Sequence, residues 1–299
     1  MFKTIPKKFD NRQVEIMGKQ IKVITNCCNR TEMSCCGGGG GGGCCMSMFL
    51  HLTNVCNSSC SFCIADKNKS EISNFKKLES TISELVQKQV ISKIVLTGGE
   101  PLLHSNFPYF LKMLDKVDLM WYSLNTNGTL LNKYIYQIND SKLKHINISI
   151  HHHDDKINKS IMGKCCTWEE IGNLNNSFNK NIEVRAACTI SKELNTESEI
   201  MKYIETAKAH GLNNVIFRNE YRGFDKNLSS FKKIWEKLYT ADICNCGYKL
   251  INGINAEFRQ SNIKLKQAIS EANTYFRDFI YKDDDMLSGS WEYGFQNIG

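Results

Sequence analysis

Three cysteines in the segment CNSSCSFC have a spacing that can hold an iron–sulfur cluster. Cys56, Cys60 and Cys63 follow the pattern C-x3-C-x2-C. Three thiolates on one loop can ligate three irons of a [4Fe–4S] cluster, whereas clusters that only carry electrons usually have four cysteines. The fourth iron then stays open to a substrate or cofactor, as in catalytic metal sites that keep one position free. A zinc loop, or three buried small residues, is the alternative interpretation.

The segment TGGEP is a second group with chemical potential. Gly98 and Gly99 let another group approach the backbone closely, and the carboxylate of Glu100 suits an ammonium group. A glycine turn, which often follows a strand, is the alternative. Because the segment comes soon after Cys63 and is followed by Pro101, we expect a binding role.

The run HHHDD at 151–155 offers groups for proton transfer, substrate contact or metal binding. His151 is the candidate catalytic residue of this run. A polar loop with at most one inward-pointing side chain is an equally good interpretation. A dedicated metal site is the least expected, because adjacent residues rarely converge on one ion.

The other cysteines of the fourteen in the chain are less informative. Six form adjacent pairs around seven consecutive glycines, Gly37 to Gly43. A glycine run has high backbone entropy, so we expect a flexible insert, with zinc binding, a second cluster or a redox relay as alternatives. Near the C-terminus, Cys244 and Cys246 are too few for a complete further cluster. The adjacent pairs are Cys27/Cys28, Cys35/Cys36 and Cys44/Cys45.

The elements around these groups alternate between strand and helix patterns. Such alternation implies a parallel sheet with helices packed outside it. A closed eight-stranded barrel usually needs about 250 residues, which is more than the pattern spans. We therefore predict an α/β fold, a partial (β/α)6 TIM-like barrel with an irregular C-terminal extension. The expected strands are 48–54, 93–97, 119–125, 145–151, 183–190 and 215–219, and the expected helices are 72–86, 107–114, 130–138, 168–179, 196–207 and 229–240.

Three regions follow from this pattern: an N-terminal extension over 1–46, a core over 47–220 and a C-terminal extension over 221–299. The formal net charge is +7, and the lysines are scattered. We expect a solvated surface rather than a nucleic-acid interface, while phosphate-bearing or acidic substrates stay open. The sequence has no stretch of 18 apolar residues and no secretory signal pattern, so we expect a cytoplasmic protein without a membrane span.

The cysteine motif, with the aromatic Phe62 just before its last cysteine, resembles the signature of the radical S-adenosylmethionine (SAM) superfamily. The resemblance covers about residues 48–220. It implies an oxygen-sensitive [4Fe–4S] cluster on Cys56, Cys60 and Cys63, whose open iron binds SAM. In that family the reduced cluster cleaves SAM to methionine and a 5′-deoxyadenosyl radical, which takes a hydrogen atom from the substrate. The electron comes from a donor such as flavodoxin or ferredoxin, and the protein supplies positioning and excludes water and oxygen.

The resemblance also implies which residues contact SAM. Gly98, Gly99 and Glu100 match the GGE motif that holds the SAM amino group. Other expected contacts are strand-end polar side chains near the SAM ribose, methionine or carboxylate, with a polar turn or a structural ion pair as the alternative. They are Asn125, Thr126, Asn127, Ser149 and Arg185, and Phe62 in the cysteine motif is a further expected cofactor contact.

Some peptide epimerases of this family use a cysteine thiol to return a hydrogen atom to the substrate radical. Cys188 is the candidate for that role, with packing in a strand as the alternative. Further options are Cys165, Cys166, Cys244 and Cys246, whereas Trp291 and Tyr293 are expected to be packing residues.

The substrate is expected to be a peptide, by analogy with cyclase-like relatives, and a nucleotide or cofactor precursor is the alternative. The chain differs from the molybdenum-cofactor cyclase of this family, which carries a second cysteine triad near its C-terminus. It differs equally from many peptide maturases, whose C-terminal domain carries seven or so cysteines. A non-catalytic iron–sulfur or zinc-binding redox protein is the competing class. Glu100 argues against that class, because an electron carrier needs no ammonium-binding carboxylate.

Overall fold

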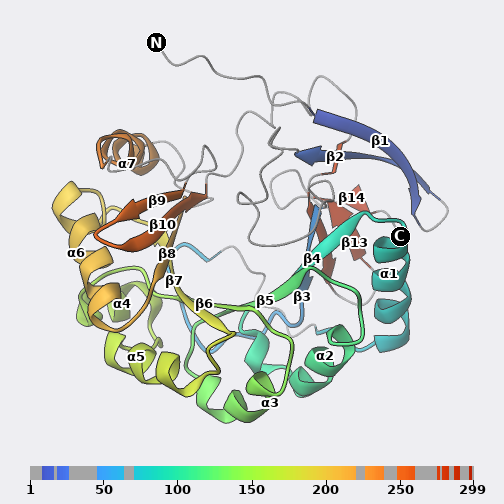
Figure 1. Cartoon of the computed structure of the whole chain (residues 1–299), viewed down its shortest axis with the longest axis horizontal. Coiled ribbons are helices and arrows are strands. Elements are labelled where there is room, and N and C mark those ends of the chain that lie inside the picture. The colour runs from blue at the N-terminus through green and yellow to red at the C-terminus, as the bar shows by residue number, and fades with distance from the viewer. Residues whose placement is uncertain are drawn as a thin grey trace.

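The structure of this chain is a computed structural model (Figure 1). The features that lie outside its described residues are the adjacent cysteine pairs around the glycine run, the pair Cys244 and Cys246, and the tail residues Trp291 and Tyr293. Within the described residues, no helix is long and apolar enough to cross a membrane. The described residues are 9–16, 19–26, 46–63, 71–219, 226–238, 248–259, 275–276, 278–282, 286–289 and 296–297.

Six neighbouring strands form the centre of the fold, and each pairs in parallel with the next. They follow one another in the sheet in the same order as in the sequence, which confirms the predicted partial barrel. All six begin and end within a few residues of the expected bounds, and β7 has the expected bounds. The strands are β3 (Met46–His51), β4 (Ile91–Thr97), β5 (Trp121–Thr126), β6 (His145–Ser149), β7 (Glu183–Ile190) and β8 (Asn214–Asn219).

Helices cover the outer side of this arc of strands, as Figure 1 shows for α1 to α6. One of them, α4, is not predicted by the sequence patterns above. Asp154 caps its N-terminus, and the Asp154 carboxylate accepts hydrogen bonds from the backbone N–H groups of Lys156 and Ile157. The segment expected as a helix over 130–138 is a 3-10 turn followed by a short α-helix. The bounds are α1 (Phe75–Gln87), η1 (Pro101–Leu103), α2 (Phe107–Leu114), η2 (Leu131–Tyr134), α3 (Ile135–Asn139), α4 (Asp155–Met162), α5 (Trp168–Ser177), α6 (Glu197–Ala209) and α7 (Lys226–Lys237).

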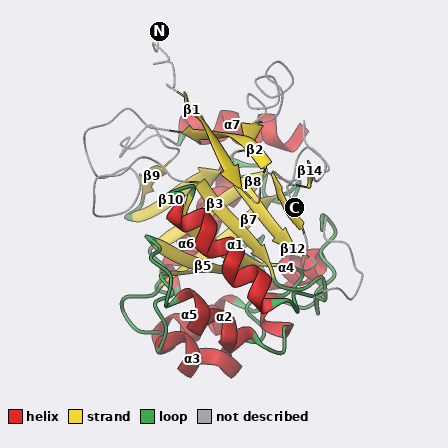
Figure 2. Ribbon diagram, turned by 90° about the vertical axis from the view of Figure 1, so that its right-hand side faces the viewer, coloured by secondary structure: helices red, strands yellow, loops and turns green. Residues whose placement is uncertain are grey.

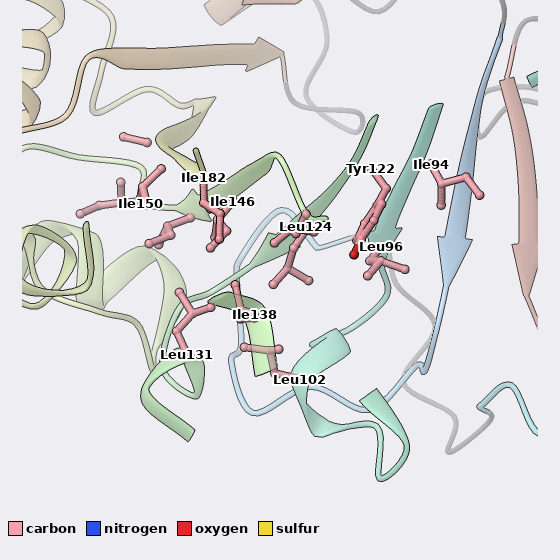
Figure 3. Packing of buried hydrophobic residues seen from close by; sticks show 14 of the residues in the cluster. Ile94, Leu96, Leu102, Tyr122, Leu124, Leu131, Ile138, Ile146, Ile150 and Ile182 are labelled. Atoms are coloured by element: carbon pink, nitrogen blue, oxygen red, sulfur yellow. The ribbon is translucent and has the colours of Figure 1, made fainter. Parts of the chain in front are cut away.

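The two faces of the sheet differ in character. Successive residues of a strand point to opposite faces, so one alternating set meets the helices and the other faces the inside of the arc. Figure 3 shows Leu96, Leu124 and Ile146 packed in the core with Leu131 and Ile138 of the helical layer. The inner set carries polar side chains, including Asn125 and Asn147, which lie opposite each other in neighbouring strands.

The C-terminal region extends both edges of the sheet, so it is more regular than the sequence predicts. On one side β10 (Ile254–Arg259) pairs in parallel with β8, and β9 (Tyr248–Ile251) follows it. On the other side β12 (Asp278–Lys282) pairs in parallel with β3, followed by β13 (Met286–Gly289) and β14 (Gln296–Asn297). The eleven-stranded sheet runs from β14 to β9, and no pairing among the described residues joins these two edges.

A smaller sheet is formed by the N-terminal region, in which the sequence shows only a short apolar run. Its strands β1 (Phe9–Ile16) and β2 (Lys19–Asn26) make an antiparallel hairpin, and β11 (Tyr275–Phe276) pairs in parallel with β2. In Figure 1 this hairpin lies on the side of β13 and β14, across the molecule from α7, and Figure 2 views the molecule from that side.

Candidate functional site

The three cysteines of the motif lie on the loop that leaves the carboxyl end of β3. All three are free thiols; Cys56 is exposed, and Cys60 and Cys63 are half-buried. The sulfur of Cys56 accepts a hydrogen bond from the backbone N–H of Ser58 at 3.3 Å. The backbone N–H of Cys63 donates to the carbonyl of Cys60 at 3.1 Å. The loop therefore turns back on itself and presents its thiols from one short segment.

Burial raises the pKa values of the Cys56 and Cys60 thiols above their ordinary value. Burial is the largest cause for Cys60, whose pKa is raised to about 12, and the neighbouring Cys63 and Cys56 add to the shift. Three thiolates in this position need a compensating positive charge, which bound iron provides. Three thiolates match three irons of a [4Fe–4S] cluster, whereas structural zinc sites have four protein ligands. The donor set therefore fits a cluster of several irons better than a single zinc ion.

Gly98 and Gly99 place the end of β4 directly against the start of this loop. The N–H of Gly99 donates to the carbonyl of Thr53 at 2.7 Å, and the N–H of Glu100 donates to the carbonyl of Val55 at 2.8 Å. A Cβ at Gly99 would lie 2.4 Å from the Val55 carbonyl oxygen, and one at Gly98 would lie 2.5 Å from that of Thr53. The two glycines are thus required for the close approach of two backbones, which holds whether or not they also contact a cofactor.

The carboxylate of Glu100 is buried and already accepts three hydrogen bonds. Its Oε1 accepts from the backbone N–H of Leu102 at 3.1 Å and from the hydroxyl of Thr126 at 2.7 Å, and its Oε2 accepts from the N–H of Asn127 at 2.8 Å. Burial raises the pKa of Glu100, and these hydrogen bonds oppose that effect. The side chain joins the end of β4 to the end of β5, so its observed partners are protein groups.

The inner face below these strand ends carries a network of polar side chains. The amide of Asn147 donates to Oδ1 of Asn125 at 2.8 Å, and Asn147 itself is 4% exposed. Arg185 lies opposite Asn147 in the sheet and forms an ion pair with Glu183, which also accepts from His145 at 2.9 Å. Burial raises the pKa of Glu183, but hydrogen bonds and charge from His145 and Arg185 lower it below its ordinary value.

Arg185 lies away from the strand ends, where a contact with SAM is predicted from the sequence. It lies well before the carboxyl end of β7, and its guanidinium is engaged with Glu183. The observed pair with Glu183 agrees with the alternative of a structural ion pair, and a contact of Arg185 with SAM stays a prediction. Ser149, by contrast, is the last residue of β6 and is half-buried, so it lies at the edge where the site is expected.

His151 and Phe62 lie together beside the cysteine loop. Their rings make an edge-to-face contact with centroids 4.8 Å apart. Nδ1 of His151 accepts a hydrogen bond from the N–H of Thr189 at 2.9 Å, so the ring is a neutral imidazole with its proton on Nε2. Burial lowers the pKa of His151 to about 3. A neutral ring that cannot easily gain a proton is suited to contact and hydrogen bonding rather than to acid catalysis.

The next two histidines meet a carboxylate from α6. Nε2 of His153 lies 2.5 Å from an oxygen of Glu199, and Nε2 of His152 lies 3.3 Å from the same oxygen. Nδ1 of His152 accepts the N–H of Asp154 at 2.9 Å, which places the His152 proton on Nε2. A nitrogen that carries a proton does not ligate a metal ion, so the group is an anchor between the end of β6 and α6.

Cys188 faces the helical layer and not the inside of the arc. It is buried in the core, and its thiol donates to the carbonyl of His151 at 3.5 Å. The structure therefore does not bring it to the site as a hydrogen-atom donor, and packing in a strand is its observed role. Cys166 is also buried, whereas Cys165 is half-buried and accepts a hydrogen bond from Asn158.

Several residues of the site are absent from the sequence analysis. Asn57, Ser58 and Thr129 bond to Asn127, and Asn147 lines the inner face. Asn147 has a usable signal, because it lies between His145 and Ser149 in a strand whose other residues are isoleucines. Asn57 and Ser58 have none, because their partners are distant in the sequence.

Comparisons with known proteins give relatives in sequence. The chain is 36% identical over 124 residues to the probable GTP 3′,8-cyclase of Methanococcus aeolicus, which covers 39% of this chain and 41% of that protein. It is 27% identical over 173 residues to the GTP 3′,8-cyclase of Aliarcobacter butzleri, which covers 54% of this chain and 51% of that protein. The chain thus spans about half the length of the curated relatives it matches.

Solved structures share the fold at low sequence identity. Streptococcus suis SuiB bound to S-adenosylmethionine has a TM-score of 0.64 at 14% identity, covering 85% of this chain and 63% of that one. The enzyme anSMEcpe with bound AdoMet and the Cp18Cys peptide has a TM-score of 0.61 at 17% identity, covering 85% of this chain and 76% of that one. The family model described as the Radical SAM superfamily matches residues 50–219, more than half of the chain. The chain therefore belongs to the radical SAM superfamily, whose members use a [4Fe–4S] cluster and SAM.

Proposed function

We propose that this chain is an enzyme that cleaves SAM and abstracts a hydrogen atom from a substrate held inside the arc of strands. The observation that supports this most strongly is the packing of the cysteine loop against the end of β4, with hydrogen bonds from Gly99 and Glu100 to Thr53 and Val55. When bound, a reduced cluster and SAM supply the 5′-deoxyadenosyl radical. We propose Cys56, Cys60 and Cys63 as the cluster ligands, with an electron donor such as flavodoxin or ferredoxin.

The protein groups in this proposal bind and orient. SAM lies at the strand ends, where Ser149 and the backbone around Gly98 and Gly99 are available to it. Phe62 and His151 form the wall on the side of β6 and exclude water there. The proposed substrate lies against the half-buried Asn125 on the inner face, which the buried Asn147 holds by a hydrogen bond.

The test is anaerobic reconstitution with iron and sulfide, followed by reduction in the presence of SAM. We expect about four irons per chain and formation of 5′-deoxyadenosine, detected by liquid chromatography and mass spectrometry. Cys60→Ala should lose both, because two thiolates cannot hold the cluster in place of three. Cys166→Ala is the matched control, since this buried cysteine lies outside the loop and should keep both. A fully reconstituted wild-type protein that produces no 5′-deoxyadenosine would contradict the proposal.

Two substrate classes are supported by different observations. The sequence relatives are named for GTP, which supports a nucleotide or cofactor precursor. Solved structures that share the fold include one bound to a precursor peptide and one bound to the Cp18Cys peptide, which supports a peptide, the class we propose first. Incubation with deuterated GTP separates them: deuterium in 5′-deoxyadenosine identifies GTP as a substrate, and its absence in an active preparation rejects GTP.

A further inference from the structure

We infer that Asn127 is a positioning residue that clamps the cysteine loop between the end of β5 and the end of α4, so that the thiols are prearranged before the cluster forms. This inference rests on the proposed function, because it takes Cys56, Cys60 and Cys63 as the cluster ligands. It assigns to Asn127 a role on the loop itself in place of the expected contact with SAM.

The side chain of Asn127 uses all of its hydrogen-bonding capacity on protein groups. Its amide nitrogen donates to Oδ1 of Asn57 at 2.7 Å and to the hydroxyl of Ser58 at 2.9 Å. Its oxygen accepts from the N–H of Thr129 at 3.1 Å and from the Thr129 hydroxyl at 2.8 Å. An amide has two donors and two acceptor lone pairs, so none is left for a ligand.

These bonds reach the part of the loop that carries the ligands. Asn57 and Ser58 follow Cys56 directly, and Asn57 also donates to the hydroxyl of Thr129 at 2.9 Å. The backbone N–H of Asn127 donates to Glu100. A continuous chain of hydrogen bonds therefore runs from the GGE segment through Asn127 to the residue beside the first cysteine.

The other side of the loop is held by the C-terminal turn of α4. The N–H of Ser59 donates to the carbonyl of Met162 at 2.8 Å, and the N–H of Ser61 donates to that of Ile161 at 3.1 Å. The hydroxyl of Ser58 donates to the carbonyl of Lys164. Gly163, at φ +74°, allows this contact, because a Cβ there would lie 2.4 Å from the Ser59 hydroxyl.

Asn127 therefore acts on the cluster through the loop, as partners of metal ligands commonly do. Changing such partners typically lowers metal affinity or activity about 10–100-fold. For Asn127→Ala we expect a cluster that still assembles, with altered g-values in the electron paramagnetic resonance spectrum of the reduced form. The rate of 5′-deoxyadenosine formation should fall about 10–100-fold.

Asn127→Asp is the isosteric variant, which keeps the acceptor for Thr129 and replaces the donor to Asn57 by an oxygen. It should reproduce the altered spectrum without a loss of side-chain volume. Asn139→Ala is the matched control, because Asn139 bonds to Ser177 and Asn179 in an unrelated turn. Its spectrum and rate should equal those of the wild type.

The α4 side is tested independently by a pair of changes. Gly163→Ala should alter the spectrum in the same way by pushing Ser59. Adding Ser59→Ala removes the hydroxyl that the new methyl group meets, so the double variant should recover the wild-type spectrum even if backbone strain at position 163 lowers its stability.

A cluster-free measurement separates this inference from the proposed function. In the apo protein, Asn127→Ala should speed hydrogen exchange over 56–63 and leave exchange over α6 unchanged. If the wild type assembles no cluster but the variant loosens this loop, the cluster ligands are wrong and the clamp stands. If Asn127→Ala equals the wild type in loop exchange, spectrum and rate, the clamp is wrong whatever the cluster result.

Discussion

Glu100 shows how a residue can have the expected identity and a different set of partners. Its carboxylate, 1% exposed, accepts from Leu102, Thr126 and Asn127. A carboxylate can be buried this deeply only when hydrogen-bond donors surround it, because an unpaired charge in this environment is very unfavourable. The three donors would in turn lose their acceptor if the carboxylate were removed.

Glu100→Ala should therefore lower the free energy of unfolding by at least about 3 kcal/mol, since an unsatisfied buried donor costs about 1–3 kcal/mol. Glu100→Gln keeps one acceptor oxygen and should lose less. Urea unfolding of the apo protein measures both. Glu205→Ala, on the exposed face of α6, should stay within about 0.5 kcal/mol of the wild type. Equal stabilities for Glu100→Ala and Glu205→Ala would contradict the assigned role.

Glu199 makes the free energy of unfolding depend on pH, and this dependence can be assigned to its carboxylate alone. Hydrogen bonds from Lys202 and His153 lower its pKa to about 2, from an ordinary value of 4.5. A carboxylate with a lowered folded-state pKa contributes stability above its unfolded pKa and loses it as the pH falls towards the folded value.

The stability difference between the wild type and Glu199→Gln should therefore shrink as the pH falls from about 4.5 to about 2. Unfolding of the apo protein in urea at several pH values measures it. Because the side chain is partly exposed, solvent screening makes the difference small. A difference that grows on acidification would show that the ion pairs with His153 and Lys202 are not formed.

At the scale of elements, the site depends on how closely the loop after β3 approaches the end of β4. The distance is set by backbone hydrogen bonds between Thr53 and Gly99 and between Val55 and Glu100. A side chain cannot fit between these two backbones, so positions 98 and 99 must both be glycine.

Gly99→Ala should displace the loop, because its Cβ would lie 2.4 Å from the Val55 carbonyl oxygen. We expect loss of 5′-deoxyadenosine formation and a fall of about 1–3 kcal/mol in the free energy of unfolding, typical of overpacking. Gly172→Ala in α5 is the control: its Cβ would lie 3.3 Å from His210, and helix propensity favours alanine there. An active Gly99→Ala variant would mean that the approach is not needed.

For the whole molecule, the C-terminal region protects the edges of the central sheet. The strand β12 covers the edge of β3, the strand from which the cysteine loop leaves. Tyr281 of β12 lies opposite Leu50 and is fully buried. The position of the loop thus depends on a segment more than two hundred residues further along the chain.

Tyr281→Ala should lower the free energy of unfolding by about 3–5 kcal/mol, the usual effect of removing a large buried aromatic side chain. The melting temperature should fall accordingly, and the exposed edge of β3 should increase aggregation. Tyr136→Ala provides the comparison, because Tyr136 is 80% exposed and should change stability by less than about 0.5 kcal/mol. If both variants melt alike, β12 does not support the sheet.

The sequence by itself determined the features that depend on local spacing. Periodicity located the six parallel strands, since residues in strands and helices alternate between faces with fixed periods. The motifs identified the cysteine loop and the GGE segment, because their residues are close in the chain. The parts of the chain that pair at long range followed from the tertiary structure alone. They include the strands β10 and β12 at the two edges and the bonds from Asn127 to Asn57 and Ser58. Only the tertiary structure also decided which side of β7 carries Cys188 and which partner Arg185 takes, because both depend on the neighbouring strands and helices.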